Sequence, residues 1–196
     1  MAKTDTRTTI LEAVLHLLDS QERATYEAVA QGAGVSRQTV YTHFPTRAEL
    51  LVAAVDRARE TTGMAAATSA VLEAPTARAA LEAFVELHCS IVPRILAAYV
   101  AVERERSLDP DIEAAFVARS GGRRQLALLV ATRLQAEKDL IAPWTATTAC
   151  DLICTVTSGT TTAQLLRDVD WTVAELRERL LVVLQRSLLE PTEREE

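Results

Sequence analysis

Arg37 and Gln38 have the clearest chemical potential in this sequence, because each can make two hydrogen bonds to one planar partner. An arginine guanidinium can donate both bonds to a guanine edge, and a glutamine amide can pair with adenine. Both residues follow Ser36, a preferred N-cap residue, so we expect them in the first turn of a helix. This placement favours contact with base edges. The alternative is an exposed arginine at a helix start.

The segment around these two residues has the pattern of two short helices joined by a tight turn. Apolar residues recur at spacings that let the two helices pack steeply on each other. Gly34 stands where the first helix ends, in a position that favours the left-handed backbone of glycine. Pro45 ends the second helix, and the stretch from Thr46 to Glu49 forms a capping box for a third. The segment therefore predicts a helix-turn-helix, whose second helix enters the DNA major groove. The residues we expect to be structural are Val29, Ala30, Gly34, Val35, Val40 and Phe44.

The charge of the chain argues mildly against DNA binding. The formal net charge is −6 and the pI is near 5.2. A strongly acidic protein binds nucleic acid poorly without specific contacts. However, no acidic residue lies between Glu27 and Glu49, and this stretch contains Arg37, His43 and Arg47. Binding would rest on this acid-free patch, doubled by dimerisation.

Composition and periodicity predict an all-α protein of about nine helices, with no strand, repeat or low-complexity segment. Hydrophobic residues make up 48% of the chain, whereas aromatic residues make up only 4%. The prolines are expected at helix starts, and Gly121-Gly122 is expected to interrupt one helix. The expected helices are 7–20, 25–32, 36–43, 46–62, 76–91, one opened by Pro93, 110–137, 143–168 and 172–189.

The N-terminal pattern resembles the TetR family of transcriptional regulators. The resemblance rests on A-Q-G-A-G-V-S (Ala30 to Ser36), T-V-Y-T-H-F (Thr39 to Phe44) and T-R-A-E-L-L (Thr46 to Leu51). It covers about residues 7–60, and the stretch from Thr157 to Thr172 resembles the family's helix 8 to helix 9 junction. Pro45-Thr46-Arg47 departs from the family's more lysine-rich pattern, so one positive charge is missing.

The resemblance implies an all-α homodimer with a DNA-binding domain at residues 1–62 and an effector-binding and dimerisation domain at 63–196. Most members of the family repress transcription and leave the operator when a small molecule binds. Tyr41 and His43 match positions where phosphate contacts are usual, although His43 packing under the first helix is an equal alternative. The full predicted DNA-binding set is Thr25, Tyr26, Ser36, Arg37, Gln38, Thr39, Tyr41, Thr42, His43, Thr46 and Arg47.

Two apolar stripes on the last two helices predict a dimer interface, in which both helices of each chain form a four-helix bundle. Small residues at the centre of the first stripe permit close helix approach. The alternative is that both stripes pack inside one protomer. The predicted interface residues are Leu152, Val156, Gly159, Ala163, Leu166, Leu176, Leu180, Val183 and Leu184, with Val173 on the second stripe.

Polar and aromatic side chains on otherwise apolar helices are the candidates for an effector pocket. For each of them a purely structural role is the stronger alternative. They are Phe84, His88, Tyr99, Glu103, Phe116, Trp144, Thr148 and Asp151, with Ser158 beside them. Cys150 and Cys154 share a helix face, and a small hydrophobic role is favoured over a metal or thiol sensor.

The sequence predicts no enzyme, cofactor or metal site. It contains no Gly-rich phosphate loop, no Glu-x-x-His pair and no nucleophile with a readable base. No apolar run reaches the length of about 18 residues that suits a membrane span, so we expect a cytoplasmic protein. Its expected partners are double-stranded operator DNA, a second copy of the chain and a small-molecule effector. An activator, and a helical ligand-binding or enzymatic protein that does not bind specific DNA, stay as alternatives.

Overall fold

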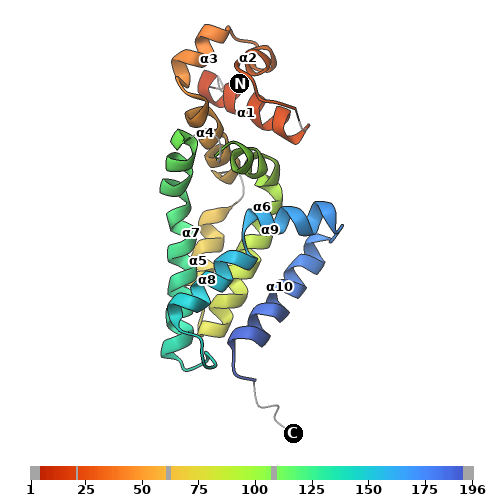
Figure 1. Cartoon of the computed structure of the whole chain (residues 1–196). Helices are drawn as coiled ribbons and strands as arrows, with labels where there is room; N and C mark the ends of the chain where they lie inside the picture. The colour runs from red at the N-terminus through yellow and green to blue at the C-terminus, as the bar shows by residue number, and fades with distance from the viewer. Residues whose placement is uncertain (1–4, 21, 61–62, 107–109, 192–196) are drawn as a thin grey trace. The chain divides into compact units, whose positions relative to one another are not determined.

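The computed structural model describes residues 5–20, 22–60, 63–106 and 110–191 of the chain (Figure 1). In these ranges it forms ten α-helices and one π-helical segment, with no β-strand, which confirms the predicted all-α class. The helices are α1 (Thr6–Asp19), α2 (Tyr26–Ala33), α3 (Arg37–His43), α4 (Arg47–Glu60), α5 (Met64–Leu72), α6 (Ala77–Arg106), α7 (Pro110–Ala136), α8 (Ala146–Val156), α9 (Gly159–Ala163), η1 (Gln164–Asp168) and α10 (Val173–Leu188).

The chain divides into two compact units. The first comprises residues 1–62 and 94–119, and the second comprises residues 63–93 and 120–196. The first unit thus contains the predicted DNA-binding segment together with the end of α6 and the start of α7. Both long helices pass from one unit to the other, near Pro93 in α6 and near Gly121 in α7.

The first unit has its own apolar core, to which each of its helices contributes. The buried residues of α1 follow the 3–4 residue spacing of an amphipathic helix, whereas α4 is buried continuously from Leu50 to Val55. Val40 is the residue of α3 that reaches this core, and Phe44 seals the core directly after the helix. The main contributors are Ile10, Leu11, Val14, Val29, Val40, Phe44, Leu50, Leu51, Val102 and Ile112.

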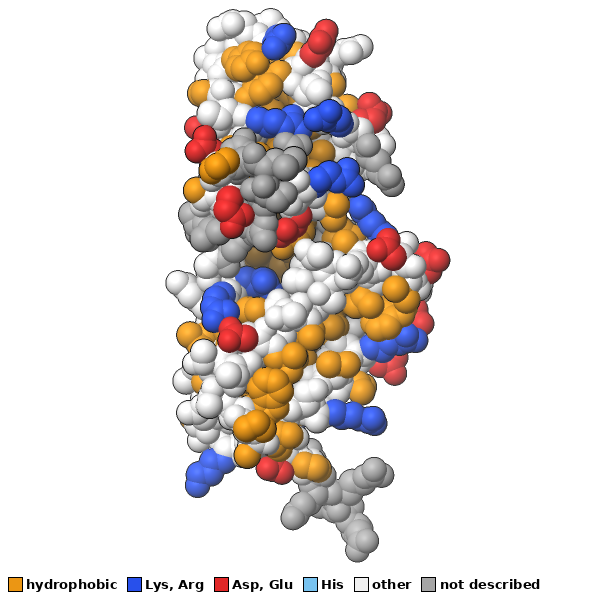
Figure 2. All heavy atoms as spheres, viewed as in Figure 1, with side chains coloured by type: hydrophobic (Ala, Val, Ile, Leu, Met, Phe, Trp, Pro, Cys, Tyr) orange, Lys and Arg blue, Asp and Glu red, His pale blue; other side chains and the backbone are white. Residues whose placement is uncertain are grey.

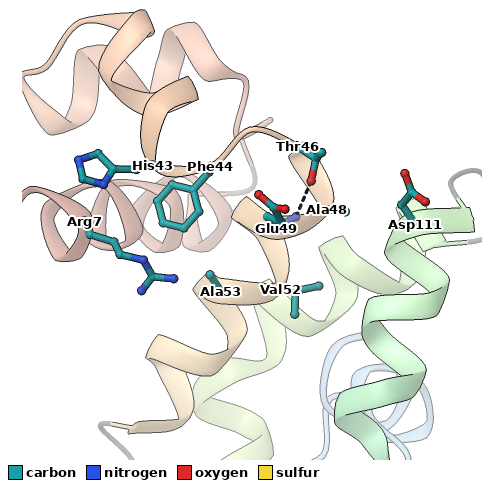
Figure 3. Close-up of a pocket in the computed structure, with 9 residues that line it drawn as sticks. All are labelled: Arg7, His43, Phe44, Thr46, Ala48, Glu49, Val52, Ala53 and Asp111. Atoms are coloured by element: carbon teal, nitrogen blue, oxygen red, sulfur yellow. Dashed lines mark hydrogen bonds between the residues drawn. The ribbon is translucent and has the colours of Figure 1, made fainter.

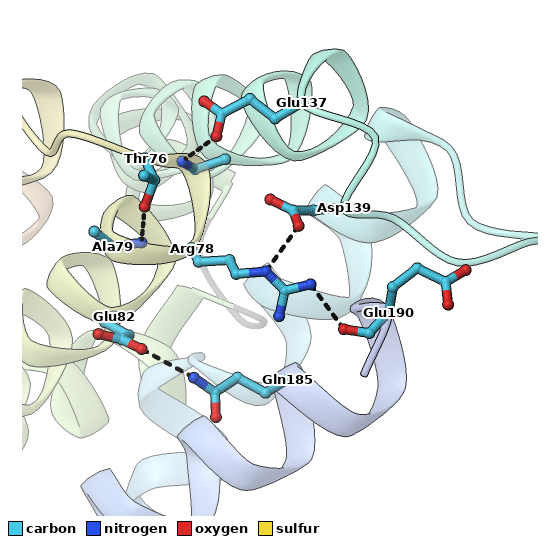
Figure 4. Close-up of polar contacts among 9 residues, drawn as sticks. Thr76, Arg78, Ala79, Glu82, Glu137, Asp139, Gln185 and Glu190 are labelled. Carbon is cyan, nitrogen blue, oxygen red and sulfur yellow. Dashed lines mark hydrogen bonds and ion pairs between the residues drawn. The ribbon is translucent and has the colours of Figure 1, made fainter. Parts of the chain in front are cut away.

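The second unit packs its helices around a separate core (Figure 1). The main contributors are Leu81, Phe84, Val85, Val130, Leu134, Ile153, Leu176, Leu180, Leu184 and Leu188. A polar cluster closes one end of this unit (Figure 4). Arg78 donates from Nε to Asp139 Oδ1 at 2.7 Å and from Nη2 to the carbonyl oxygen of Glu190 at 2.7 Å. One arginine thereby ties the start of α6 to the loop before α8 and to the end of α10.

Several predicted helix boundaries are wrong. α6 is one helix that contains Pro93, rather than two helices separated there, and α7 continues through Gly121-Gly122. The predicted helix 143–168 begins at Ala146 and ends at Val156, and Ser158 then caps α9 by accepting from the amide of Thr161. The short helix α5 was not expected.

α10 buries part of the stripe that the sequence assigned to a dimer surface. Leu176, Leu180 and Leu184 lie inside the core of the protomer, so their assignment to an interface is corrected. Gly159 is buried as well. The exposed hydrophobic residues here are Val173, Val182 and Val183, and Val169 precedes the helix. The predicted residues Leu152, Val156, Ala163 and Leu166 are half-buried. Figure 2 shows hydrophobic side chains in a band over the part of this unit where Figure 1 places α8 and α10.

Within the described residues, Ala77–Arg104 of α6 is long and apolar enough to span a membrane by length and composition. The most apolar window of this helix is 44% buried inside the protein. Leu81, Phe84 and Val85 of this helix lie in the core of the second unit. A core helix of a folded domain passes the same test, so this is weak evidence for a membrane span.

Candidate DNA-binding site

The turn between α2 and α3 has the local geometry that the sequence predicts. Gly34 has a φ of 65°, in the left-handed region that glycine adopts without a Cβ penalty. The amide of Val35 donates to the carbonyl of Ala30 at 3.0 Å, which closes the end of α2. Ser36 then accepts from the amide of Thr39 at 3.0 Å and caps α3. The helix-turn-helix is therefore set by local hydrogen bonds on both sides of the turn.

α3 presents a polar face on the side opposite Val40. Arg37, Gln38 and Thr42 are exposed, whereas Thr39 is half-buried. The Thr42 hydroxyl donates to the carbonyl of Gln38 at 2.9 Å, and the Thr39 hydroxyl lies 2.8 Å from that of Ser36. The two threonine hydroxyls are thus engaged within the helix, while their methyl groups add to its surface. Arg37 and Gln38 are the long side chains that this face offers to a partner.

A stacked pair of tyrosines supports this face. The rings of Tyr26 and Tyr41 lie parallel, with centroids 4.1 Å apart and an interplanar angle of 7°. The Tyr26 hydroxyl donates to the carbonyl of Phe44 at 2.9 Å, which holds the end of α3 against the start of α2. Burial raises the pKa of Tyr26 above its ordinary value, and the nearby Tyr41 adds to the shift.

Arg37 lies against the same tyrosine. Its Nη2 donates to the Tyr41 hydroxyl at 3.2 Å, and its guanidinium carbon lies 5.4 Å from the centroid of the Tyr41 ring. The hydrogen bond that Arg37 donates to Tyr41 is the main cause of a raised pKa for Arg37. The two residues are four apart on one helix, which is the spacing of neighbouring side chains. Tyr41 therefore orients Arg37 along the exposed face.

The remaining predicted residues gather at the helix starts. Thr25 caps α2 by accepting from the amide of Ala28 at 3.2 Å, and Thr46 does the same for Glu49 at 3.2 Å. Arg47 is half-buried, and its Nη1 donates to the carbonyl of Ala24. Arg47 thus has a structural contact between α4 and the segment before α2, which the sequence did not indicate.

His43 is exposed rather than buried under α1, and it lies beside Phe44 with ring centroids 6.5 Å apart. Arg7 of α1 places its guanidinium over the Phe44 ring, 5.0 Å from the centroid. Sequence reasoning missed Arg7. Its position in the first turn of an amphipathic helix that packs on the helix-turn-helix was the available signal.

The structure does not bring the predicted effector residues together. Phe84 and His88 are buried in the core of the second unit, Trp144 is half-buried against that core, and Tyr99 and Glu103 belong to the first unit. Thr148 and Asp151 are exposed; Thr148 completes the capping box of α8, and Asp151 pairs with Arg124 at 2.7 Å. The side chain of Phe116 lies outside the described residues.

His88 has the structural role that was the stronger alternative for it. Its Nε2 lies 2.8 Å from the Thr162 hydroxyl, and that hydroxyl also lies 2.9 Å from the carbonyl of Ser158. Because the Ser158 carbonyl can only accept, the Nε2–H of His88 donates to Thr162. Burial, together with the positive charge of Arg123, lowers the pKa of His88 to about 4.

The cysteines are in environments that disfavour the reactive thiolate. Burial raises the pKa of Cys150 to about 11, with the neighbouring Cys154 adding to the shift. Burial also raises the pKa of Cys89 to about 11. In the described part of the chain, no three His, Cys, Asp or Glu side chains are grouped to hold a metal ion.

Comparison with known proteins agrees with this geometry. The family model "Bacterial regulatory proteins, tetR family" matches residues 10–54, which contain the helix-turn-helix. The predicted resemblance is confirmed, and residues 10–54 are a TetR-family helix-turn-helix domain. A search of curated proteins finds no match to the chain.

Solved structures share the fold over nearly the whole chain. A protein described as a transcriptional regulator from Saccharomonospora viridis, in complex with choline, has a TM-score of 0.77 at 18% identity, covering 96% of this chain and 100% of that chain. The fatty acid degradation regulator FadR from Bacillus halodurans has a TM-score of 0.75 at 16% identity, covering 94% and 97%. NalD of Pseudomonas aeruginosa, the secondary repressor of the MexAB-OprM multidrug efflux pump, has a TM-score of 0.69 at 20% identity, covering 95% and 98%. The chain therefore has the same fold as these structures over nearly its whole length.

Proposed function

We propose that this protein is a dimeric, sequence-specific transcriptional repressor that a small-molecule effector releases from a palindromic operator. The main observation in support of this proposal is the exposed face of α3, where Tyr41 orients Arg37 beside Gln38 in the first helical turn. Both side chains suit direct reading of base edges. Thr25, Tyr26, His43 and Thr46 are the proposed phosphate contacts on either side of this face, and Arg47 has a supporting position.

Dimerisation is part of the proposal because one short recognition helix reads too few base pairs for useful specificity. Two copies would place their α3 helices about 34–36 Å apart, on successive major grooves. The exposed Val182 and Val183, with the half-buried Leu152, Val156 and Leu166, offer an apolar surface on the second unit that would suit the partner. No catalytic step or cofactor is part of the proposed function, and we place the protein in the cytoplasm, where its DNA partner lies.

The repressor role and the effector are proposals by similarity. NalD is a repressor, and the Saccharomonospora viridis protein binds choline. A ligand releases DNA only if it binds the DNA-free conformation more tightly than the DNA-bound one. The choline complex of the Saccharomonospora viridis protein supports regulation by a small organic molecule, whose site we propose in the helical second unit. The sequence of the operator and the identity of the effector have to come from experiment.

The test is selection of bound DNA from a random duplex pool with the purified protein. The selection is repeated with a variant that carries Arg37→Ala and Gln38→Ala. The matched control carries Gln125→Ala and Arg186→Ala, which removes the same side-chain types from exposed positions of the second unit. We expect a two-fold-symmetric site for the wild type and the control, and its loss in the recognition-helix variant.

The opposite result has a clear meaning. If a folded, dimeric wild-type protein enriches no sequence, specific DNA recognition is excluded. The second candidate, a helical ligand-binding protein that does not act through specific DNA, would then take its place. If the recognition-helix variant enriches the same site as the wild type, other residues read the operator.

A further inference from the structure

The first unit contains a cavity of about 380 Å³ beside the turn between α3 and α4 (Figure 3). Arg7 and His43 line it together with Glu49 and Asp111, so its charge favours neither an anion nor a cation. Asp111 is also already engaged in an interaction within the protein. The second unit contains a feature whose chemistry selects one class of ligand, the pair of thiols on α8.

Cys150 and Cys154 act as neighbours on one face of α8. They are four residues apart, which places their side chains one helical turn apart on the same side. Cys150 is buried, Cys154 is half-buried, and both thiols are free. A hydrogen bond between the two thiols contributes to the raised pKa of Cys150. The two sulfur atoms are therefore close enough to bind one atom together.

Helix α7 fixes the position of this pair. The Cys150 thiol donates to the carbonyl oxygen of Arg124, with Sγ 3.7 Å from that oxygen. Arg123 Nη1 donates to the carbonyl oxygen of Cys154 at 3.1 Å. The Arg124 guanidinium, which pairs with Asp151 at 2.7 Å, lies near enough to both thiols for its charge to interact with them. A cation beside the pair favours the exchange of the thiol protons for a ligand.

The helical spacing of the pair disfavours a disulfide. A disulfide needs Cβ atoms about 3.5–4.5 Å apart, whereas residues four apart on a helix have Cβ atoms about 5–6 Å apart. One atom inserted between the sulfurs removes this strain, because it lengthens the bridge by one bond. Cysteine sulfur prefers soft, polarisable acceptors. Trivalent arsenic is such an acceptor, and its pyramidal geometry holds two sulfurs on the same side.

We propose that Cys150 and Cys154 form a binding site for a trivalent arsenical that carries one organic group. The arsenic atom bonds to both sulfurs and keeps its bond to carbon. In the reaction of an arsine oxide, R–As=O, two As–S bonds form and the As–O bond breaks. The oxygen leaves as water with both thiol protons, and no atom changes its oxidation state. Cys154, the more exposed thiol, bonds first, and Cys150 then closes the ring in an intramolecular step.

A regulatory role for this site rests on the proposed function. Leu152 and Val156 of the same helix belong to the apolar surface proposed for the partner subunit. An arsenic bridge between Cys150 and Cys154 changes the packing of α8, and with it the dimer that holds two α3 helices on the operator. The arsenical is then the effector. Arsenic binding is measured without DNA, so its failure is distinct from a failure of operator recognition.

The test is the retention of phenylarsine oxide by the reduced full-length protein in competition with glutathione, which has a single thiol. After addition of one equivalent, intact-mass spectrometry should show one phenylarsenic group per chain, with one of the three cysteines still open to alkylation. Cys150→Ala and Cys154→Ala each leave one thiol of the pair. Half-release from either variant should need at least about tenfold less glutathione than release from the wild type. Cys89→Ala, on α6, is the matched control and should behave as the wild type does.

Circular dichroism shows whether each variant is folded, and Cys154→Ala changes a half-buried side chain outside the centre of the core. Equal release from the wild type and the folded Cys154→Ala variant would overturn the two-thiol site. Loss of retention in Cys89→Ala alone would place the arsenic elsewhere and would also overturn it. Retained arsenic with unchanged operator affinity, measured by fluorescence anisotropy, would confirm the site and overturn its regulatory role.

Discussion

At the scale of single residues, the sequence predicted which side chains of α3 are exposed better than it predicted the contacts that orient them. Arg37 and Gln38 are exposed at the start of α3, as Ser36 indicated. The stack of Tyr26 on Tyr41 joins residues of two different helices, so no local pattern encodes it. The contact of Arg47 with the Ala24 carbonyl is equally non-local. Contacts of this kind depend on how the helices pack.

The bond between Arg37 and Tyr41 predicts an energetic coupling in operator binding. Tyr41→Phe keeps the stack on Tyr26 but removes the hydroxyl that accepts from Arg37. We expect a loss of operator affinity of about two- to tenfold, as for one ordinary hydrogen bond. In the Arg37→Ala background the same change should have almost no effect, since its partner is absent. Fluorescence anisotropy with the selected operator measures all four proteins.

A control substitution on the same helix distinguishes this coupling from a general disruption of α3. Thr42→Val alters the exposed face of α3 without a contact to Arg37, so its effect should add to that of Tyr41→Phe. Additive losses for Tyr41→Phe and Arg37→Ala would show that Tyr41 does not position Arg37.

His88 predicts a pH dependence of stability. Its pKa in the folded protein is about 4, below the ordinary value of 6.5. Below a pH of about 6.5, His88 is protonated in the unfolded chain but stays neutral in the folded protein. The free energy of unfolding therefore falls as the pH is lowered, until the pH nears 4. The contribution is at most about 3 kcal/mol at the lower end of this window. Urea unfolding of the wild type and of His88→Gln at pH 7 and pH 4.5 measures it.

We expect the two proteins to respond differently to acid. His88→Gln keeps a donor for Thr162 but has no titrating ring, so it should lose less stability between the two pH values. His16→Gln, at an exposed position of α1, should follow the wild type. A His88→Gln variant with the full wild-type loss would mean that carboxylates alone cause the acid sensitivity.

At the scale of helices, side-chain caps were better guides than prolines. The predicted starts at Ser36 and Thr172 lie at true caps, where each hydroxyl accepts from an amide in the first turn. Pro93 did not end α6, because the buried Ile91, Ile95 and Leu96 hold the helix on both sides of it. Proline removes one hydrogen bond, and tertiary packing can offset that cost.

The sequence did not predict α5 or the break after α8, and the two omissions have different reasons. α5 is rich in alanine, which favours a helix, but Val71 is its only buried residue, so no apolar stripe marked it. Ser158 carried a readable cap signal, which the continuous apolar spacing of the surrounding residues obscured. Intrinsic propensity and capping would have corrected both predictions.

The polar cluster at Arg78 predicts that one side chain fixes the end of α10 (Figure 4). Arg78→Lys keeps the charge but loses the planar fork that reaches both Asp139 and the Glu190 carbonyl. We expect a loss of about 1–2 kcal/mol in unfolding free energy, discounted because the pair is partly exposed. Hydrogen exchange at the Ile141 and Glu190 amides, which bond across this junction, should accelerate.

Arg177→Lys is the matched control for this prediction. Arg177 pairs with Glu86 at 3.1 Å, and both side chains are more than half exposed. Its loss should cost less than about 0.5 kcal/mol and leave the exchange of both amides unchanged. Equal effects of the two substitutions would show that the Arg78 cluster is an ordinary surface ion pair.

At the scale of the whole molecule, the sequence predicted the class and the helix-turn-helix, but not the grouping of residues from distant helices. Phe84 and His88 were candidates for a pocket because polar or aromatic residues interrupt an apolar pattern, and both lie in a core. The same pattern describes a satisfied core residue and a ligand contact. Only the positions of the neighbouring helices distinguish the two, and these depend on long-range packing.

The exposed valines of α10 predict how the proposed dimer can be separated. Val182→Glu with Val183→Glu places two charges on side chains that are 41% and 46% exposed in the protomer. Burial of unpaired charge is costly, so we expect a shift to monomer in analytical ultracentrifugation without unfolding. The same change at Leu128 and Leu129, which are exposed on α7, is the control and should leave the dimer intact. A dimer that survives the α10 variant would move the interface elsewhere.

The two glycines of α7 lie where the helix passes between the units. Their replacement tests whether they lower the stability of the helix. No atom outside the helix lies within 4 Å of a Cβ built on Gly121 or Gly122. Alanine there should stabilise the helix by about 0.5–1 kcal/mol at each position, because it restricts the unfolded chain and meets no clash. The double variant Gly121→Ala, Gly122→Ala should therefore unfold at a higher urea concentration.

Gly34→Ala is the matched control, because the same substitution there should have the opposite sign. Gly34 has a φ of 65°, in the left-handed region that is sterically unfavourable for alanine. This holds although no neighbouring atom lies within 4 Å of a Cβ built there. Destabilisation by both substitutions would mean that α7 needs a conformation at Gly121-Gly122 that alanine disfavours. The glycine pair would then be a conformational requirement of the passage between the units, rather than a local loss of helix propensity.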